Sequence, residues 1–392
     1  MEILIISHKY PPSIGGMQKQ CLELVKGLKK YDNVHKIIYK EGSSKILFLL
    51  LSPFRLLNYL RQNPNIDIVY ANDGLMAFFL NPVVSWIKQP FIVTLHGLDV
   101  VFPFRLYQRW LSRSLSKMAG VIAVSEGTRE EIVKRSTTSQ NVFLVPNGCD
   151  KKENLPRVTK ALKKKISEII GLSIDERQIL ISLGRGVKRK GFSWAINNLI
   201  SQLSSNVIYI IVGPPVNLFS LSFMKKWLPK SIYNFIVLLN GLPTDEVEIS
   251  EAIKQKDLED RVFRISGLNQ DELIQLLSLA DIFLMPNQQI DGDFEGFGLV
   301  ALEAVTAGTL CIAANTDGIA TAIQDGENGI LMEPGDKKQW YSTLQFYLQN
   351  EEILLEKSKL FRDNTMKVSS SWQEMADNYR KIFLQIADHK MK

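Results

Sequence analysis

The chain has 392 residues, of which 45% are hydrophobic and 22% are charged, a composition ordinary for a folded, water-soluble protein. This length is too great for one ordinary core and predicts two domains. The net charge of +6 favours anionic partners such as nucleotides or acidic lipids, and nothing resembling a nucleic-acid module accompanies it. The 3 cysteines are far apart and the histidines number only 4, which argues against a disulfide framework or a zinc site.

The first residues show no secretion signal, because Met1 and Glu2 lead directly into a strand pattern. The most apolar run, Ile46 to Leu51, soon meets Pro53 and Arg55, so we expect no membrane span. These features favour the cytoplasm, a reducing compartment, and leave peripheral association with the inner face of a membrane open.

Short β-branched runs alternate with amphipathic stretches almost throughout the chain, which predicts strand–helix units around parallel sheets. We therefore expect an α/β fold with two Rossmann-like, doubly wound domains. The predicted strands are Ile3–Ser7, His35–Tyr39, Ile66–Tyr70, Phe91–Leu95, Val121–Ser125, Val142–Val145, Ile179–Leu183, Val207–Val212, Val262–Ser266, Asp281–Met285 and Leu310–Ala313.

Three segments depart from this alternation. The basic stretch Lys151–Lys165 is interpreted as a linker with solvated charges. The spacing between Val216 and Asp260 is long for a simple crossover and predicts inserted helices, whose role stays open. From Ser371 onward a final helix is expected, with Trp372 and Tyr379 on an apolar face that needs a partner.

The most informative stretch is Asp293–Glu303, which follows an apolar strand-like run and opens a helix-like run at Leu299. A helix start offers free N–H groups and the positive end of the peptide dipole, so it suits a phosphate. Glu295 and Glu303 bracket this anion site and are well placed to accept hydrogen bonds from hydroxyls. Phosphate flanked by hydroxyls describes a sugar nucleotide, although a strand–turn–helix with merely solvated acids fits the segment too.

Two strand ends of the first half carry weaker signals. Gly15 and Gly16 precede a helix and suit a phosphate or a sugar, but such a pair is more often only a turn. His96 and Asp99 lie just past a strand's carboxyl end, where ligands of open α/β sheets collect, while a lone histidine is usually structural.

In the second half, a predicted strand leads into a loop that begins Gly184-Arg185 and ends Lys190-Gly191. Arg grips two phosphate oxygens in a fork and Lys supplies a compact charge, so the loop suits a diphosphate. A basic surface loop is the alternative. The loop lacks the Gly-Lys-Ser/Thr ending of a P-loop, which disfavours ATP hydrolysis.

Taken in order, these motifs resemble the retaining GT-B glycosyltransferases of group 1, glycosyltransferase family 4, over nearly the whole chain. The Glu-x7-Glu helix and the Arg/Lys loop are specific, and the Gly-Gly element is not. The matching segments are Gly15-Gly16, Thr94–Asp99, Ile122–Ser125, Pro146–Asp150, Gly184-Arg185 with Lys190-Gly191, Glu295 with Glu303, Asp325–Gly329 and Ser371-Trp372. The chain departs from the family at Gly213–Pro215 and at Asp317–Thr321, which bears on the identity of the donor.

The resemblance implies catalytic roles for His96, Arg185, Lys190 and Glu295. Arg185 and Lys190 would neutralise the departing donor diphosphate. Glu295 would orient hydroxyls of the transferred sugar, and His96 would approach that sugar from the other domain. Glu303 would accept hydrogen bonds from the ribose hydroxyls.

The resemblance also implies donor contacts from backbone groups. Amides near Phe297, Gly298 and Leu299 would hold the sugar and the distal phosphate, and Gly16 would contact donor phosphate or acceptor. No metal would be required, since Arg185 and Lys190 occupy the place of a cation.

The architecture implied is two domains facing a central cleft. Residues 1–150 with 372–392 would form the acceptor domain and residues 166–368 the donor domain. The reaction implied is retaining transfer of a hexose-type sugar from a UDP- or GDP-linked donor to a lipid-linked or cell-surface glycan precursor, as in polysaccharide or lipopolysaccharide biosynthesis. A non-catalytic nucleotide-sugar-binding protein and a GT-B-fold epimerase are the alternatives.

Two basic, partly apolar segments bear on the acceptor. Cations recur at every fourth residue of Phe104–Lys117, and Lys45–Arg61 is apolar with basic ends. Such helices either lie on an anionic membrane surface or are core helices with a solvated basic face, and the sequence leaves both readings open.

Overall fold

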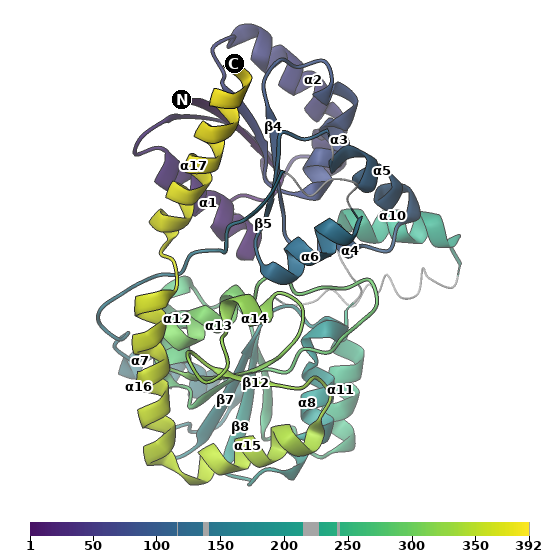
Figure 1. The fold of residues 1–392 in the computed structure, drawn as a ribbon. Coiled ribbons are helices and arrows are strands. Elements are labelled where there is room, and N and C mark those ends of the chain that lie inside the picture. Colours follow the sequence, from purple (N-terminus) through teal and green to yellow (C-terminus); the bar gives the residue numbers. More distant parts are fainter. Residues whose placement is uncertain (116, 136–140, 215–226, 241–243, 392) are drawn as a thin grey trace. The chain divides into compact units, whose positions relative to one another are not determined.

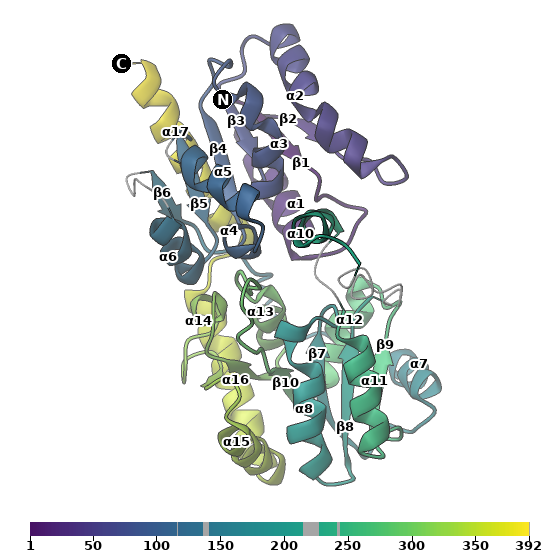
Figure 2. The same cartoon turned by 90° about the vertical axis from the view of Figure 1, so that its right-hand side faces the viewer.

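The chain forms two compact α/β units in a computed structural model that describes residues 1–115, 117–135, 141–214, 227–240 and 244–391. Each unit contains a six-stranded parallel sheet with helices on both faces (Figures 1 and 2). The expected α/β class with doubly wound sheets is confirmed. The first unit comprises Met1–Cys149, Gly292–Phe297 and Ser370–Lys392, and the second comprises Asp150–Asp291 and Gly298–Ser369.

The sheet of the first unit has the order β2-β1-β3-β4-β5-β6. Strands β3 and β4 are buried along their whole length, as expected of parallel strands covered on both faces. The elements of this unit are β1 (Glu2–Ser7), α1 (Gly16–Leu28), β2 (Asn33–Ile38), α2 (Lys45–Gln62), β3 (Ile68–Ala71), α3 (Gly74–Val84), β4 (Phe91–Leu95), α4 (Leu98–Val101), α5 (Arg105–Leu115), β5 (Gly120–Ala123), α6 (Glu126–Arg135), β6 (Val142–Leu144) and α17 (Trp372–Met391).

The final helix α17 packs beside α1 on one face of this sheet, while α2, α3 and α5 cover the other face (Figures 1 and 2). The two helices approach closely, since a Cβ on Gly27 of α1 would lie 2.3 Å from the Cβ of Ala376. The apolar face predicted for this helix is confirmed, with Trp372 and Tyr379 buried against the rest of the unit.

A buried polar network joins α17 to the strands beneath it. The Tyr70 hydroxyl lies 2.7 Å from Thr94 Oγ1 and 3.0 Å from Asn72 Oδ1. The Tyr379 hydroxyl lies 3.1 Å from Thr94 Oγ1 and accepts a hydrogen bond from Gln20 Nε2 at 3.2 Å. Because buried polar groups are costly unless satisfied, this network fixes the ends of β3 and β4 relative to both helices.

The sheet of the second unit has the order β12-β11-β10-β7-β8-β9. Helices α8 and α11 cover one face, and α12, α13 and α16 cover the other (Figure 1). The elements are α7 (Lys160–Ile170), β7 (Gln178–Leu183), η1 (Lys188–Lys190), α8 (Phe192–Asn198), η2 (Ile200–Gln202), β8 (Val207–Val212), α10 (Lys230–Asn240), α11 (Glu246–Gln255), β9 (Val262–Ile265), α12 (Gln270–Leu279), β10 (Ile282–Met285), α13 (Leu299–Thr306), β11 (Leu310–Ala314), α14 (Ile319–Ala322), β12 (Ile330–Met332), α15 (Lys337–Gln349) and α16 (Glu351–Val368).

The interpretation of Lys151–Lys165 as a linker is wrong for its last residues. Helix α7 begins at Lys160, capped by the Thr159 side chain, which accepts a hydrogen bond from Leu162 N. Its lysines face outward, while Leu162 is buried. Of the long segment 216–260, the structure describes helices α10 and α11, and residues 216–226 and 241–243 lie outside the described residues.

Both sheets reverse their strand order in the middle, between β1 and β3 in the first and between β7 and β10 in the second. Ligands of open α/β sheets bind at such switch points, beyond the carboxyl ends of the strands. The loops that leave β1, β3, β7 and β10 are therefore the expected positions of a ligand site. None of the helices that the structure describes is long and apolar enough to cross a membrane.

Candidate functional site

Lys190 lies at the switch point of the second sheet. It ends the short helix η1, which follows β7, and its side chain is 7% exposed. A Cβ on Gly184 would lie 3.2 Å from Lys190 Cε and 3.7 Å from its Nζ, so the ammonium group lies over the end of β7. Arg185 is exposed at the tip of the same loop.

The loops after β7 and β10 are bound to each other. The N–H of Gln288 donates to the carbonyl of Arg189 at 2.7 Å. A Cβ on Gly191 would lie only 1.9 Å from the carbonyl oxygen of Pro286, and Gly191 has a φ of +65°. Only glycine fits this close approach in this conformation, which explains the Lys190-Gly191 pair.

The base of the Arg185 loop is held by the start of α11. The carbonyl of Gly186 accepts hydrogen bonds from Asp245 N at 2.7 Å and from the Thr244 hydroxyl at 3.0 Å. Glu246 packs against Gly186 and pairs with Arg264 of β9. These contacts are with residues far along the sequence, which is why no motif predicted them.

Helix α13 begins directly after the β10 loop with Gly298 at its N-cap, at a φ of +87° and without a side-chain cap. By contrast, α12 begins with a complete capping box made by Asn269 and Glu272. The start of α13 therefore has no side-chain cap for its first N–H groups, and the anion contact expected at Leu299 stays a prediction. Glu303 lies half-buried one turn further along.

Thr316 is a residue that the sequence analysis missed. It follows β11 at the same edge of the second sheet and is 5% exposed. Its hydroxyl has no hydrogen-bond partner among the described residues. A buried hydroxyl is usually satisfied, so this one is a candidate ligand contact.

In the first unit, His96 follows β4 and is fixed from two sides. Its Nε2 lies 2.8 Å from the carbonyl oxygen of Asn72, and since a carbonyl only accepts, Nε2 carries the hydrogen. Asp99 accepts hydrogen bonds from the backbone N–H groups of His96 at 2.8 Å and Gly74 at 3.0 Å. Burial raises the pKa of Asp99. Asp99 thus clamps the loop, and Nε2 of His96 is engaged by the Asn72 carbonyl.

Residues 292–297 belong to the first unit and pack against this histidine loop. A Cβ on Gly296 would lie 2.0 Å from the carbonyl oxygen of His96, and one on Gly97 would lie 2.5 Å from the ring of Phe294. Glu295 is half-buried between these contacts, and Phe297 is buried. The structure therefore packs the segment that contains Glu295 against the loop that contains His96.

A second buried pair in the first unit was not predicted. His8, which follows β1, lies with its Nδ1 3.1 Å from Oδ2 of Asp73, the N-cap of α3. Burial lowers the pKa of His8, and the Asp73 carboxylate opposes this shift. Burial, together with the positive charge of Lys9, lowers the pKa of Lys45 to about 8. Only the fold brings these groups together, since β1, α2 and α3 are separate in sequence.

Gly16 begins α1, whose N-cap Gly15 provides no side-chain cap. It lies at the carboxyl edge of the first sheet, like His96, because both follow parallel strands of that sheet. The candidate residues thus form two groups, and their roles stay predictions. Gly16, His96, Glu295 and Phe297 belong to the first unit, and Arg185, Lys190, Gly298, Leu299 and Glu303 belong to the second.

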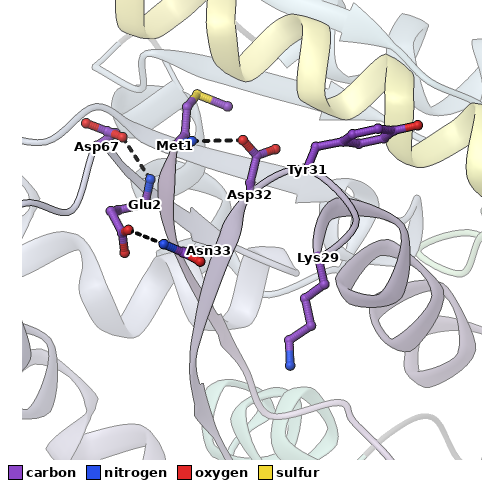
Figure 3. A pocket seen from close by; sticks show the side chains of 7 residues that line it. All are labelled: Met1, Glu2, Lys29, Tyr31, Asp32, Asn33 and Asp67. Carbon is purple, nitrogen blue, oxygen red and sulfur yellow. Dashed lines mark hydrogen bonds and ion pairs between the residues drawn. The ribbon is translucent and has the colours of Figure 1, made fainter.

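A shallow pocket of about 380 Å³ lies at the opposite, amino edge of the first sheet (Figure 3). Five of its seven lining residues bind one another: Met1, Glu2, Asp32, Asn33 and Asp67. The Met1 ammonium lies 2.9 Å from Asp32 Oδ1, and Glu2 N donates to Asp67 at 2.8 Å. Because ligands of such sheets bind at the carboxyl edge, this pocket is not the candidate site.

Comparison with known protein families identifies the chain. The family model described as glycosyl transferases group 1 matches residues 163–368. The chain belongs to this family. A second model, described as Glycosyltransferase Family 4, matches residues 14–153, so the two matches cover both halves of this group 1 glycosyltransferase. The resemblance drawn from the motifs is confirmed.

Individual relatives of this glycosyltransferase are distant. N-acetyl-alpha-D-glucosaminyl L-malate synthase of Bacillus anthracis is 23% identical over 332 residues, which cover 83% of this chain and 76% of that protein. Alpha-maltose-1-phosphate synthase of Mycolicibacterium smegmatis is 23% identical over 364 residues, which cover 85% and 84%.

Solved structures share the fold over almost the whole chain. Sucrose-phosphate synthase from Thermosynechococcus elongatus matches with a TM-score of 0.78 at 18% identity, over 99% of both chains. Anabaena Alr3699/HepE in complex with UDP and glucose matches with a TM-score of 0.75 at 16% identity, over 98% of this chain and 100% of that one. The fold is therefore the two-domain α/β fold of the GT-B glycosyltransferases.

Proposed function

We propose that this glycosyltransferase moves a hexose-type sugar from a UDP- or GDP-linked donor to an acceptor hydroxyl, with retention of configuration at the anomeric carbon. The acceptor is a lipid-linked or cell-surface glycan precursor. The observation that carries this proposal is the buried ammonium of Lys190 at the switch point of the second sheet, on the same sheet edge as the uncapped start of α13.

In the proposed step, negative charge develops on the leaving diphosphate. The bond between the anomeric carbon and the diphosphate oxygen breaks, and the acceptor oxygen bonds to the same carbon. The acceptor proton passes to the departing diphosphate. Negative charge therefore grows on the leaving group, and fixed donors aimed at that charge lower the barrier. Lys190, Arg185 and the backbone N–H of Leu299 have the chemistry to supply such donors.

Carboxylates fit the neutral parts of the donor. Glu303 would accept hydrogen bonds from the ribose, and Glu295, beside His96, would accept them from the transferred sugar. We further propose that no metal ion takes part, because Lys190 and Arg185 supply the positive charge. A nucleotide-sugar donor is supported by the HepE structure, which is a complex with UDP and glucose.

The first test is a donor screen on the purified full chain. A donor at a concentration of about 100 times its dissociation constant stabilises the folded state by about 2.7 kcal/mol, which a thermal shift detects. We expect stabilisation by UDP or GDP and their hexose derivatives, in buffer with EDTA as well as without it. A protein that no nucleotide diphosphate stabilises would not support the proposed donor site.

The second test is the product. The best donor is incubated with lipid-linked acceptors, and the anomeric configuration of the product is read by proton NMR. We expect the configuration of the donor to be retained. Donor binding without transfer to any acceptor would favour the non-catalytic alternative, and an inverted product would refute retention.

A further inference from the structure

The outward face of α2 is apolar. Its first three turns expose Ile46 (55%), Leu47 (54%), Leu50 (55%), Leu51 (37%) and Phe54 (70%). With 3.6 residues per turn, positions 46, 50 and 54 form one line along the helix, and 47 and 51 lie beside it. The opposite face is buried through Phe48, Leu49, Ser52, Leu56 and Leu60. A surface helix normally turns a polar face outward, so this stripe needs an explanation.

The stripe lies at the margin of the first unit. Helix α2 packs on α3, and both views show it at the outer edge of the helical layer formed by α2, α3 and α5 (Figures 1 and 2). Phe54, with 70% of its surface exposed, is not covered by any residue that the structure describes.

Exposed cations accompany the stripe. The sequence has no Asp or Glu from residue 42 to residue 66, whereas the exposed Arg55 and Arg61 lie in this segment; Lys45 is half-buried and belongs to the group around Asp73. The Arg55 guanidinium lies 5.2 Å from the ring centre of Phe48, at the border of the buried face.

Helix α5, which covers the same face of the sheet, adds a second basic row. Its exposed Arg105 and Arg109 lie one turn apart, and the sequence has no acid from residue 100 to residue 125. Its apolar residues Tyr107 and Leu111 are buried and Leu106 is exposed, so α5 offers one exposed apolar side chain beside its cations, whereas α2 offers five. The structure thus distinguishes two helices that the sequence left equivalent.

An apolar helical stripe with cations and no acids is the pattern of a helix that lies in the interface of a bilayer. Cations near an anionic surface add attraction that falls with salt. We propose that α2 docks the first unit on an anionic phospholipid surface, with Ile46, Leu50 and Phe54 at the acyl boundary. This surface goes beyond the proposed transfer reaction, and its test needs no turnover.

The test is sedimentation of the full chain with vesicles. Phosphatidylcholine vesicles are compared with vesicles that also contain phosphatidylglycerol, at low and high salt. We expect binding to the anionic vesicles, reduced by salt, and little binding to phosphatidylcholine alone. No sedimentation with anionic vesicles at low salt would overturn the proposal, and so would equal binding to both kinds.

A matched pair of variants locates the surface. Leu50→Glu with Phe54→Glu changes exposed side chains only and should lower the apparent partition at least about 100-fold. The control, Phe346→Glu with Leu355→Glu, places the same changes on an exposed Phe (47%) and Leu (58%) of the second unit and should leave binding unchanged.

Equal effects of the two variants would refute the assignment to α2. Gel filtration of the chain without vesicles completes the test. A dimer that the α2 variant converts to a monomer would mean that a second copy of the chain covers the stripe, and the proposal would fall.

Discussion

Replacing Lys190 by methionine tests the chemistry proposed for the donor site. The change removes the ammonium group and keeps an unbranched apolar stem of similar length in the place that is now 7% exposed. If the ammonium stabilises charge that develops on the leaving diphosphate, its loss raises the barrier by about 2.7–4 kcal/mol, which lowers kcat about 100- to 1,000-fold.

The assay separates catalysis from binding and from folding. Because the charge on the diphosphate is larger in the transition state than in the bound donor, kcat should fall more than KM rises. Urea unfolding should show a change in the free energy of unfolding below about 1.5 kcal/mol, since methionine preserves volume. Lys188→Met is the matched control, because Lys188 lies in the same short helix but is exposed and pairs with Glu248 at 3.3 Å.

Two results would refute the reasoning. A Lys190→Met enzyme that folds and keeps kcat within about 5-fold of the unaltered chain would show that the ammonium does not act on the transition state, since 1 kcal/mol corresponds to about that factor. An equal fall in kcat for Lys188→Met would show that catalysis depends on the overall positive charge of the loop and not on the position of the Lys190 ammonium.

Two further predictions concern stability. In urea unfolding, Gly191→Ala should lower the free energy of unfolding by at least about 2 kcal/mol more than Gly171→Ala. Both glycines have a left-handed backbone (φ +65° and +70°), but of the two only Gly191 faces a carbonyl, since a Cβ there would lie 1.9 Å from the oxygen of Pro286. Equal losses in the two variants would contradict the close approach. Burial lowers the pKa of His8, so below about pH 6.5 the unfolded chain takes up a proton that the folded chain resists, and the free energy of unfolding should fall from pH 7 to pH 5. His8→Gln should reduce this fall, because it removes the group whose pKa burial lowers; parallel pH profiles would contradict the assignment.

Most strands were predictable because parallel strands buried on both faces are nearly continuous apolar runs. Phe91–Leu95 and Val207–Val212 were predicted with the observed bounds. Strand β12 was not predicted, because its three residues, Ile330–Met332, are too few to give a periodic signal. The start of α7 was missed because its lysines resemble a linker. Only Thr159 at the N-cap and the buried Leu162 indicate a helix there.

The local part of the candidate site was predictable, and the long-range part was not. Glycines and cations at strand ends are visible in any single segment, as for Gly184 and Lys190. The Thr244 hydroxyl, by contrast, holds Gly186 across 58 positions, and His8 meets Asp73 only once β1 and β3 are paired with their neighbours. A pattern within one short segment of the sequence cannot predict such contacts, since they depend on the register of the sheet.

The N-terminal caps of the helices provide separate support for the same candidate sites. A side chain that caps a helix contributes about 1 kcal/mol, and α3 and α12 have such caps in Asp73 and Asn269. Helices α1 and α13 begin with Gly15 and Gly298 instead and have no side-chain cap. Both helices follow strands at the switch points of their sheets, where a bound anion is able to satisfy their N–H groups. Helices α11 and α16 also begin without a side-chain cap, so it is the position of α1 and α13 at the switch points that marks their starts as candidate anion sites.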